Sequence, residues 1–155
     1  MFKGGLQNQS GITTKYHTAT HLVHAALRKI LGEHVQQKGS NITAERMRFD
    51  FSHTQKMTNE ELKKVEQMIN KQIQMNLKVT VGTMKKEDAL NSGALGFFTQ
   101  KYGDKVTVYS IGDFSKEICG GPHVDFTGTL GTFRIEKEES AGSGIRRIYA
   151  TLGVK

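Results

Sequence analysis

The order of the helical and strand patterns constrains the fold of this chain most. Two long helical patterns lie in the first half of the sequence, and strand patterns separated by glycines follow from residue 105 onward. A doubly wound fold needs a regular alternation of strand and helix, which this order lacks. The sequence therefore predicts an α+β domain in which helices pack on one face of a mostly antiparallel sheet.

Hydrophobic periodicity locates the individual elements. It predicts a helix over residues 15–31, which ends before Gly32, and a second helix over residues 58–76. In the second helix Thr58 and Glu61 have the spacing of a capping box. The other predicted elements are strands at 47–51, 77–81, 105–111, 117–119, 132–139 and 146–152 and a short helix around 85–93.

Length and composition predict one domain in a reducing compartment. A chain of 155 residues can bury a stable core without disulfides or structural metal ions. We expect this domain over residues 15–155, after a flexible segment at 1–14. The single Cys119 cannot form an internal disulfide, which fits a cytoplasmic location. The sequence contains neither a signal-peptide pattern nor an apolar run of about 18 residues, so we expect no membrane partner.

The charge of the chain favours a polyanionic partner. Lys and Arg together number 22 against 15 Asp and Glu, which gives a net charge of +7. Such an excess is typical of proteins that bind nucleic acid. A lysine-rich face that is merely solvated would give the same count, and composition alone does not choose between the two.

Two pairs of metal-ligating residues stand far apart in the sequence. His17 and His21 are four residues apart, so they lie on one face of the predicted helix, at the edge of its apolar stripe. Cys119 and His123 form a second pair in the segment CGGPHVDFTG, which also holds the only proline. Either pair alone could be a surface feature, but three imidazoles and one thiol together suit zinc in ligand type and number.

The sequence contains three further histidines. His24 lies near the same helix face as His17, seven residues on, and is the main competitor for a place among the ligands. His34 and His53 have no partner at a useful spacing, so we interpret them as ordinary surface or cap residues.

Three stretches resemble the editing domain of alanyl-tRNA synthetases: HTATHLVHAALRKILGEHVQQKGSNITAERMRFDFSH, YSIGDFSKEICGGPHV and SAGSGIRRIYATLG. The resemblance covers about residues 15–153 and extends to the free-standing deacylases called AlaX and to the N-terminal editing domain of threonyl-tRNA synthetases. It implies hydrolysis of the ester in tRNA(Ala) mischarged with serine or glycine, with no DNA partner. The chain is either a free-standing protein or a fragment of a synthetase.

The resemblance also implies a set of site residues. Gln37, in the stretch Q-x-G-S, would take part in deacylation, and Thr20 would distinguish serine from alanine. The alternative for Thr20 is a helix residue whose hydroxyl bonds to a carbonyl one turn earlier. One Zn²⁺ per chain would be held by His17, His21, Cys119 and His123.

The RNA contacts are expected in two glycine-containing segments. Gly120 and Gly121 would let the backbone approach the terminal adenosine of the RNA. Glycine amides in residues 141–147, with Arg146 and Arg147, would grip phosphates beside the CCA end. The alternative for this segment is a hairpin turn followed by an ordinary strand.

One departure from the family pattern leaves alternatives open. Pro122 stands where the alanyl family usually has threonine, in C-G-G-T-H, and resembles the C-R-G-P-H of threonyl-tRNA editing domains. A seryl-tRNA(Thr) deacylase is therefore one alternative, and a zinc-containing tRNA-binding domain without catalysis is another. Because zinc with four protein ligands has no open position, the metal is either structural or loses a ligand such as Cys119 to the substrate.

Overall fold

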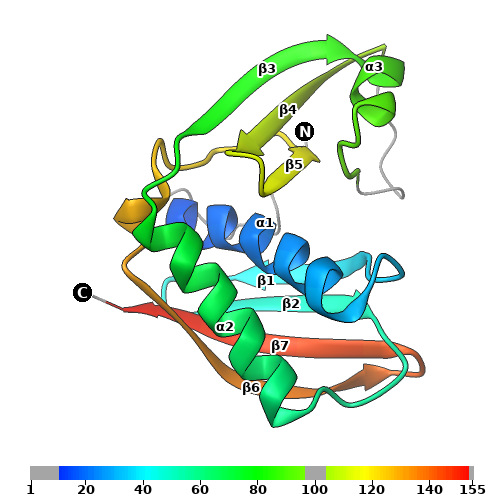
Figure 1. The fold of residues 1–155 in the computed structure, drawn as a ribbon, viewed down its shortest axis with the longest axis vertical. Helices are drawn as coiled ribbons and strands as arrows, with labels where there is room; N and C mark the ends of the chain where they lie inside the picture. The colour runs from blue at the N-terminus through cyan, green and yellow to red at the C-terminus, as the bar shows by residue number, and fades with distance from the viewer. Residues whose placement is uncertain (1–10, 97–103, 154–155) are drawn as a thin grey trace.

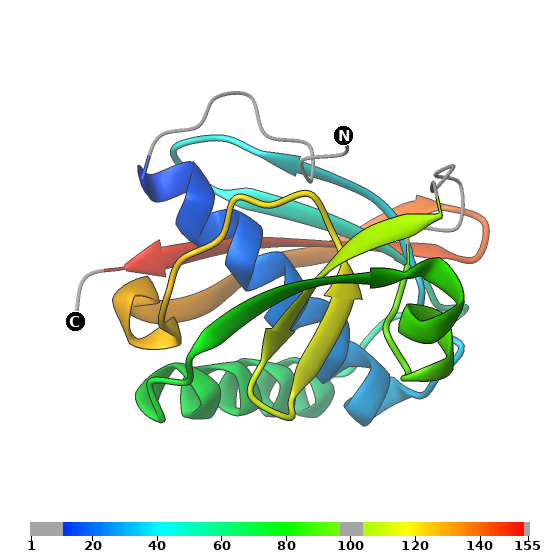
Figure 2. The same cartoon turned by 90° about the horizontal axis from the view of Figure 1, so that it is seen from above.

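The computed structural model describes residues 11–96 and 104–153, which form an α+β fold as predicted (Figure 1; Figure 2). The expected antiparallel sheet is divided into a four-stranded sheet in the order β1-β2-β7-β6 and a three-stranded sheet in the order β3-β4-β5. The elements are α1 (Gly11–Leu31), β1 (Gln37–Ile42), β2 (Met47–Ser52), α2 (Asn59–Gln74), β3 (Val79–Lys85), α3 (Lys86–Asn91), β4 (Lys105–Ile111), β5 (Ser115–Ile118), the 3₁₀ turn η1 (Thr127–Leu130), β6 (Thr132–Gly142) and β7 (Ile145–Gly153).

Helix α1 lies between the two sheets and is the central element of the fold (Figure 1). With α2 it packs on one face of the four-stranded sheet, in a core that includes Phe49, Phe51 and Phe133. Its opposite side contacts β5 of the smaller sheet. Every residue from Tyr16 to Leu27 is consequently buried. The sequence predicts that His17 and His21 lie at the edge of the core. The structure instead encloses them.

Helix α2 begins as predicted. The Thr58 hydroxyl accepts a hydrogen bond from the Glu61 amide at 3.1 Å, and the Glu61 carboxylate accepts one from the Thr58 amide at 2.9 Å. This capping box satisfies two amides that a helix start leaves unpaired. Further along, the Asn70 side chain bonds to both the carbonyl and the amide of Phe133, which fixes α2 against β6.

The structure differs from the predicted elements in several places. Strand β3 ends at Lys85, four residues beyond the predicted end, and the turn η1 was not predicted. Helix α1 begins at Gly11, four residues before the predicted start, and residues 1–10 of the expected flexible segment lie outside the described residues. Strand β1, with the sequence QKGSNI, was not predicted, because it lacks the alternation of apolar residues that marks a strand. It forms through its backbone pairing with β2.

None of the helices in residues 11–96 and 104–153 is long and apolar enough to cross a membrane.

Candidate metal centre

The two predicted ligand pairs come together where α1 meets the loop after β5. One ligand atom from each of His17, His21, Cys119 and His123 lies within 4.8 Å of the others. Nε2 of His17 is 3.4 Å from Sγ of Cys119, across 102 residues of sequence. The His123 ring stacks on the His17 ring and meets the His21 ring edge-on, with both pairs of ring centroids 4.3 Å apart. The four residues could thus hold one metal ion.

A turn that requires glycine shapes the loop. Gly121 has a φ of +68°, and a Cβ there would overlap the Tyr109 hydroxyl. The amide of Gly121 points at Sγ of Cys119 at 3.4 Å, and the next peptide bond, to Pro122, is cis. Gly121 is therefore needed for the shape of the loop itself, whereas its predicted approach to RNA stays a prediction.

The hydrogen bonds of two rings leave their Nε2 atoms free to bind a metal. Nδ1 of His17 is 3.0 Å from the Pro122 carbonyl, which can only accept, so Nδ1 carries the proton and Nε2 keeps its lone pair. Nδ1 of His123 is 3.0 Å from the Thr18 hydroxyl. That hydroxyl donates to the Thr14 carbonyl, so the His123 ring is again the donor. Nε2 of His123 is buried with no hydrogen-bond partner among the described residues.

Thr18 is a residue that the sequence analysis missed. It is fully buried, and besides orienting His123 its hydroxyl accepts a bond from the Val124 amide at 3.0 Å. It thereby ties α1 to the loop on the far side of the cluster. The available signal was its place in the stretch HTATH, between the two histidines of α1.

His24 is not part of the cluster of ligand atoms. Its Nδ1 lies 3.1 Å from one oxygen of Glu117, whose other oxygen lies 3.6 Å from Nδ1 of His21. Burial works to raise the pKa of Glu117, yet the facing rings of His21 and His24 hold that pKa below its usual value. A buried carboxylate therefore stands behind His21, in the position of an outer-shell partner of a metal ligand. The sequence analysis missed Glu117, whose available signal was its place two residues before Cys119.

Burial sets the protonation of the four candidate ligands. It lowers the pKa of His17 to about 4 and that of His123 to about 2, and it holds the pKa of His21 well below the usual value. The imidazoles are accordingly neutral near pH 7 and have lone pairs to donate. Burial also raises the pKa of the Cys119 thiol to about 12. Three neutral imidazoles and a thiol that can lose its proton to a cation fit Zn²⁺.

The two predicted catalytic residues make local contacts. The Thr20 hydroxyl donates to the His17 carbonyl at 2.6 Å, the bond that the alternative interpretation expected. Gln37 begins the edge strand β1, and its amide donates to the Ser40 hydroxyl at 3.2 Å. Their roles in deacylation stay predictions.

The two predicted phosphate-binding arginines are engaged with carboxylates. The Arg146 guanidinium donates two bonds of 2.8 Å to Glu138, and that of Arg147 bonds to both oxygens of Asp50 at 2.8 and 3.1 Å. They lie at the start of β7, after a β6–β7 turn, which matches the hairpin alternative. An arginine whose charge is already balanced attracts a phosphate less strongly.

His34 and His53 lie at or near the surface, as interpreted, but they partner each other although their sequence spacing does not suggest it. Nε2 of His34 is 2.8 Å from Nδ1 of His53, and the rings are stacked. Ser52, next to His53 at the end of β2, donates a hydrogen bond to the His34 carbonyl in the turn before β1, which holds the two segments together. Sequence spacing could not reveal a contact that the sheet creates.

The comparisons with known proteins agree with this geometry. A family model described as the threonyl and alanyl tRNA synthetase second additional domain matches residues 106–149, which include Cys119 and His123. The chain is 60% identical over 152 residues to an alanine–tRNA ligase of Treponema denticola, covering 98% of the chain and 25% of that protein. The identity is 59% with the alanine–tRNA ligase of Borrelia hermsii, covering 98% and 26%. For that of Coxiella burnetii it is 53% over 137 residues, covering 88% and 16%.

The chain is an α+β domain with a buried cluster of three histidines and one cysteine. Together with these relatives, this places it among the domains of aminoacyl-tRNA synthetases. More particularly, the chain belongs to the editing-domain family of the alanyl-tRNA synthetases. It spans about a quarter of the length of the first alanine–tRNA ligases that it matches.

Replacing Thr18 by valine should weaken zinc binding. Thr18→Val keeps the shape of the side chain but removes the hydroxyl that orients His123. Loss of such an outer-shell partner typically costs about 10- to 100-fold in metal affinity, and we expect a loss of this size. Competition with a chromophoric chelator measures it. Thr20→Val is the matched control, because its hydroxyl bonds only within the helix; equal losses in both variants would contradict the assignment.

Zinc binding should release about one proton per chain. The histidines are already neutral, because burial lowers their pKa values, so only the Cys119 thiol has a proton to lose. Affinity should then rise about tenfold per pH unit between about pH 6 and 8. Calorimetry in buffers of different ionisation enthalpy counts the protons, and Cys119→Ser should release almost none. A clearly larger release at about pH 6, where ordinary histidines hold protons, would show that the rings are not neutral.

Proposed function

We propose that this chain is a zinc-dependent aminoacyl-tRNA deacylase that hydrolyses the ester of serine or glycine on tRNA(Ala). The observation that carries the proposal is the buried cluster of three histidines and one cysteine in an editing-domain homologue of alanine–tRNA ligases. The net charge of +7 supports tRNA as the partner. A cytoplasmic location remains a prediction.

The reaction has a physical reason in the limits of selection by size. A synthetic pocket made for alanine binds glycine nearly as well and excludes serine poorly, because one methyl or one hydroxyl gives little discrimination. A second site can correct the serine error if it offers groups that serine satisfies and alanine leaves unpaired. A buried polar group without a partner costs about 1–3 kcal/mol, which is enough to select against the correct product.

In the proposed mechanism Gln37 positions the attacking water. His17, His21, Cys119 and His123 would hold the zinc, which would supply positive charge to polarise the ester carbonyl. The Gln37 amide, at the open start of an edge strand, would orient the water by a hydrogen bond. The water adds to the ester carbonyl, the ester C–O bond breaks, and the proton of the water passes to the departing ribose oxygen. The adjacent ribose hydroxyl assists that transfer.

Thr20 would select serine by accepting a hydrogen bond from the serine hydroxyl. Its proton is committed to the His17 carbonyl at 2.6 Å, but its oxygen keeps lone pairs. The hydroxyl of a bound seryl group would donate to that oxygen, whereas the methyl of an alanyl group would leave it unpaired.

A second candidate function is suggested by Pro122. The proline in this loop is shared with threonyl-tRNA editing domains, and its carbonyl fixes the His17 ring. A deacylase for seryl-tRNA(Thr) would use the same cluster with another tRNA. The RNA contacts predicted for Gly120, Gly121, Arg146 and Arg147 remain predictions in both cases.

Hydrolysis of three charged tRNAs tests the proposed function. We expect rapid hydrolysis of Ser-tRNA(Ala), slower hydrolysis of Ser-tRNA(Thr) and no hydrolysis of Ala-tRNA(Ala), measured by the loss of labelled amino acid from tRNA. Faster hydrolysis of Ser-tRNA(Thr) would favour the second candidate. Stability of all three in the presence of zinc-loaded protein would leave only a tRNA-binding role without catalysis.

Thr20→Val should slow hydrolysis of Ser-tRNA(Ala) more than that of Gly-tRNA(Ala). Glycine has no hydroxyl to pair, so only the serine substrate loses a bond, at a cost of about 1–3 kcal/mol or roughly 5- to 100-fold in rate. Single-turnover rates measure the difference. Gln37→Ala is the comparison and should slow both substrates alike, since the water is common to both. Equal losses for Thr20→Val would show that its hydroxyl does not select the substrate.

A further inference from the structure

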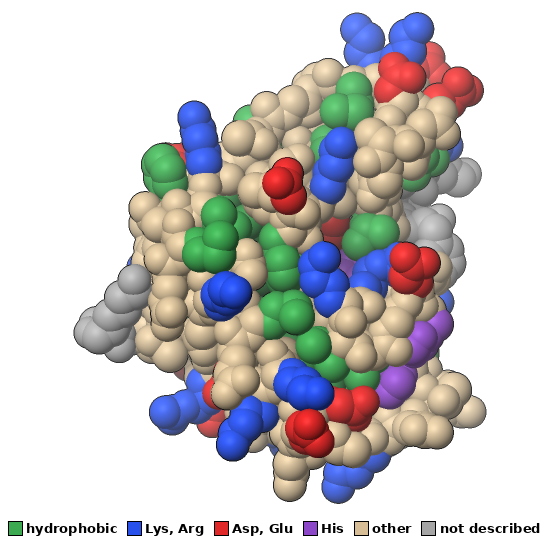
Figure 3. Space-filling model, viewed as in Figure 1, with side chains coloured by type: hydrophobic (Ala, Val, Ile, Leu, Met, Phe, Trp, Pro, Cys, Tyr) green, Lys and Arg blue, Asp and Glu red, His purple; other side chains and the backbone are tan. Residues whose placement is uncertain are grey.

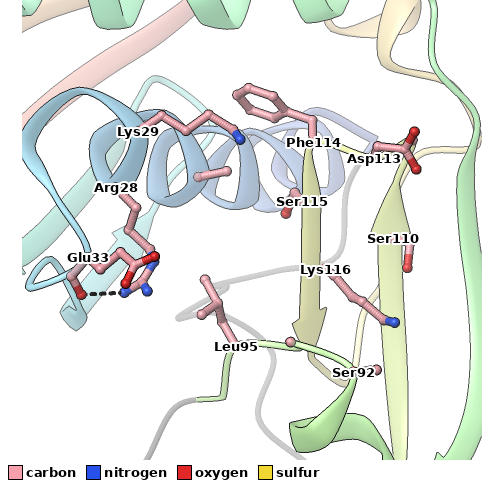
Figure 4. Close-up of a pocket in the computed structure, with 13 residues that line it drawn as sticks. Arg28, Lys29, Glu33, Ser92, Leu95, Ser110, Asp113, Phe114, Ser115 and Lys116 are labelled. Atoms are coloured by element: carbon pink, nitrogen blue, oxygen red, sulfur yellow. Dashed lines mark hydrogen bonds between the residues drawn. The ribbon is translucent and has the colours of Figure 1, made fainter.

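A second concave site lies beside the metal centre, between α1 and the turn that joins β4 to β5. This cavity, which we call the α1–β5 cavity, has a volume of about 620 Å³ and is lined by Lys29, Phe114, Ser115 and Lys116 among others (Figure 4). Its volume is within the range of sites that hold small molecules or single nucleotides. The metal cluster uses none of these four side chains.

The α1–β5 cavity and the metal centre share the same two elements. Ala25, which lines the cavity, follows His21 by one helical turn, a rise of about 6 Å. Ser115 lies at the start of β5, and Cys119 follows directly after the end of that strand. The buried pair of His24 and Glu117 separates the two sites. A flexible ligand with one end at the metal cluster could therefore also extend into the cavity.

Cations prevail around the cavity. Its lining contains Arg28, Lys29 and Lys116 against the acids Glu33 and Asp113. The Arg28 side chain is held in place, because its Nη1 donates to the carbonyls of Glu33 and Val35 at 2.8 and 2.7 Å. The cavity thus has a fixed guanidinium and two lysines for a ligand that carries negative charge.

A neighbouring groove extends the basic surface along α2. It shares Lys29 and Phe114 with the cavity and adds Lys64 and Lys71. In Figure 3 Lys and Arg side chains stand beside hydrophobic ones on this face of the molecule. Cations that flank an apolar floor are typical of a surface that follows an RNA backbone while bases stack on side chains.

Two side chains in the cavity, Ser115 and Phe114, suit a ligand for different reasons. The Ser115 side chain is buried, with the residue 6% exposed, and its hydroxyl makes no hydrogen bond within the described part of the chain. Burying such a hydroxyl without a partner lowers the stability of the folded protein, and a ligand that pairs with it would remove this penalty. The half-buried Phe114 ring has Nζ of Lys29 at 5.4 Å from its centroid, so an aromatic face and a cation stand together (Figure 4). Bases stack on such faces while phosphates meet the cations.

We propose that the α1–β5 cavity binds a nucleotide of single-stranded RNA, next to the residue whose ester enters the metal centre. The base stacks on Phe114, the phosphates contact Lys29 and Lys116, and the Ser115 hydroxyl donates to a phosphate or ribose oxygen. The inference rests on the proposed function in one respect, that charged tRNA is the partner. It adds the place at which the unpaired 3′ end of that tRNA is held.

Binding of a labelled single-stranded RNA of about eight nucleotides tests the proposal without any hydrolysis. The double variant Lys29→Ala/Lys116→Ala should bind more weakly, and the slope of log affinity against log salt should become shallower by about 1.4, for two phosphates at about 0.7 each. Phe114→Leu should lower affinity about 5- to 100-fold with the slope unchanged, because it removes a stacking face and no charge. Fluorescence anisotropy over a series of salt concentrations gives both quantities.

A matched control separates this site from general charge. Lys56→Ala/Lys63→Ala likewise removes two lysine charges, but from a different cavity on the other side of α2, and should leave the salt slope nearly unchanged. Equal effects of the two double variants would overturn the proposal in favour of diffuse attraction by the basic surface. No change in the Lys29 and Lys116 variant would overturn it outright.

Ser115→Ala separates binding from folding. Because the hydroxyl is buried without a partner, its removal should leave the melting temperature unchanged or higher, while RNA affinity falls about threefold or more. Unchanged affinity would remove Ser115 from the site. If the wild-type protein binds the RNA through these residues but hydrolyses no charged tRNA, the proposed function fails and the inference stands. If it hydrolyses charged tRNA but the variants do not change RNA binding, the inference fails and the proposed function stands.

Discussion

The enclosure of α1 between two sheets is the constraint on which the rest of the structure depends. A helix with one exposed face can carry polar residues there at no cost, but α1 is buried from Tyr16 to Leu27. Its histidines and threonines must therefore find partners inside the protein. The partners of the histidines come from β5 and from the loop that follows it, which provide Glu117, Cys119 and the Pro122 carbonyl. The Thr18 and Thr20 hydroxyls donate to carbonyls of α1 itself.

The small sheet is attached to the rest of the molecule by these polar contacts and by the main core, which includes Ile111 of β4 and is packed against by Val79 of β3. Its own apolar cluster, around Val106 and Val108, is separate from the main core beneath α1 and α2. A metal held by α1 and the loop would cross-link the two parts and contribute its binding free energy to the folded state. Loss of the metal should therefore be felt most by the smaller sheet, and this dependence links the chemistry of the site to the stability of the fold.

Residue patterns predicted the parts of the fold that local physics determines. The capping box at Thr58, the helical stripes and most of the strands follow from periods and caps. Strand β1 was missed, because polar residues with a glycine have no strand preference until β2 pairs with them. In the site, the spacing of the ligand pairs identified the four cluster residues as candidates. Thr18 and Glu117 were missed, since a partner of a ligand is defined by packing between distant segments rather than by spacing.

The contact between His17 and Pro122 has a consequence for how this loop can vary. The imidazole is oriented by a main-chain oxygen, so no particular side chain is required at residue 122 to orient it. A sequence change there can alter the surface that faces an incoming substrate while the oxygen still holds the ring. This separation of tasks offers a reason why proline can stand here, where the alanyl family usually has threonine, without loss of the contact that orients His17.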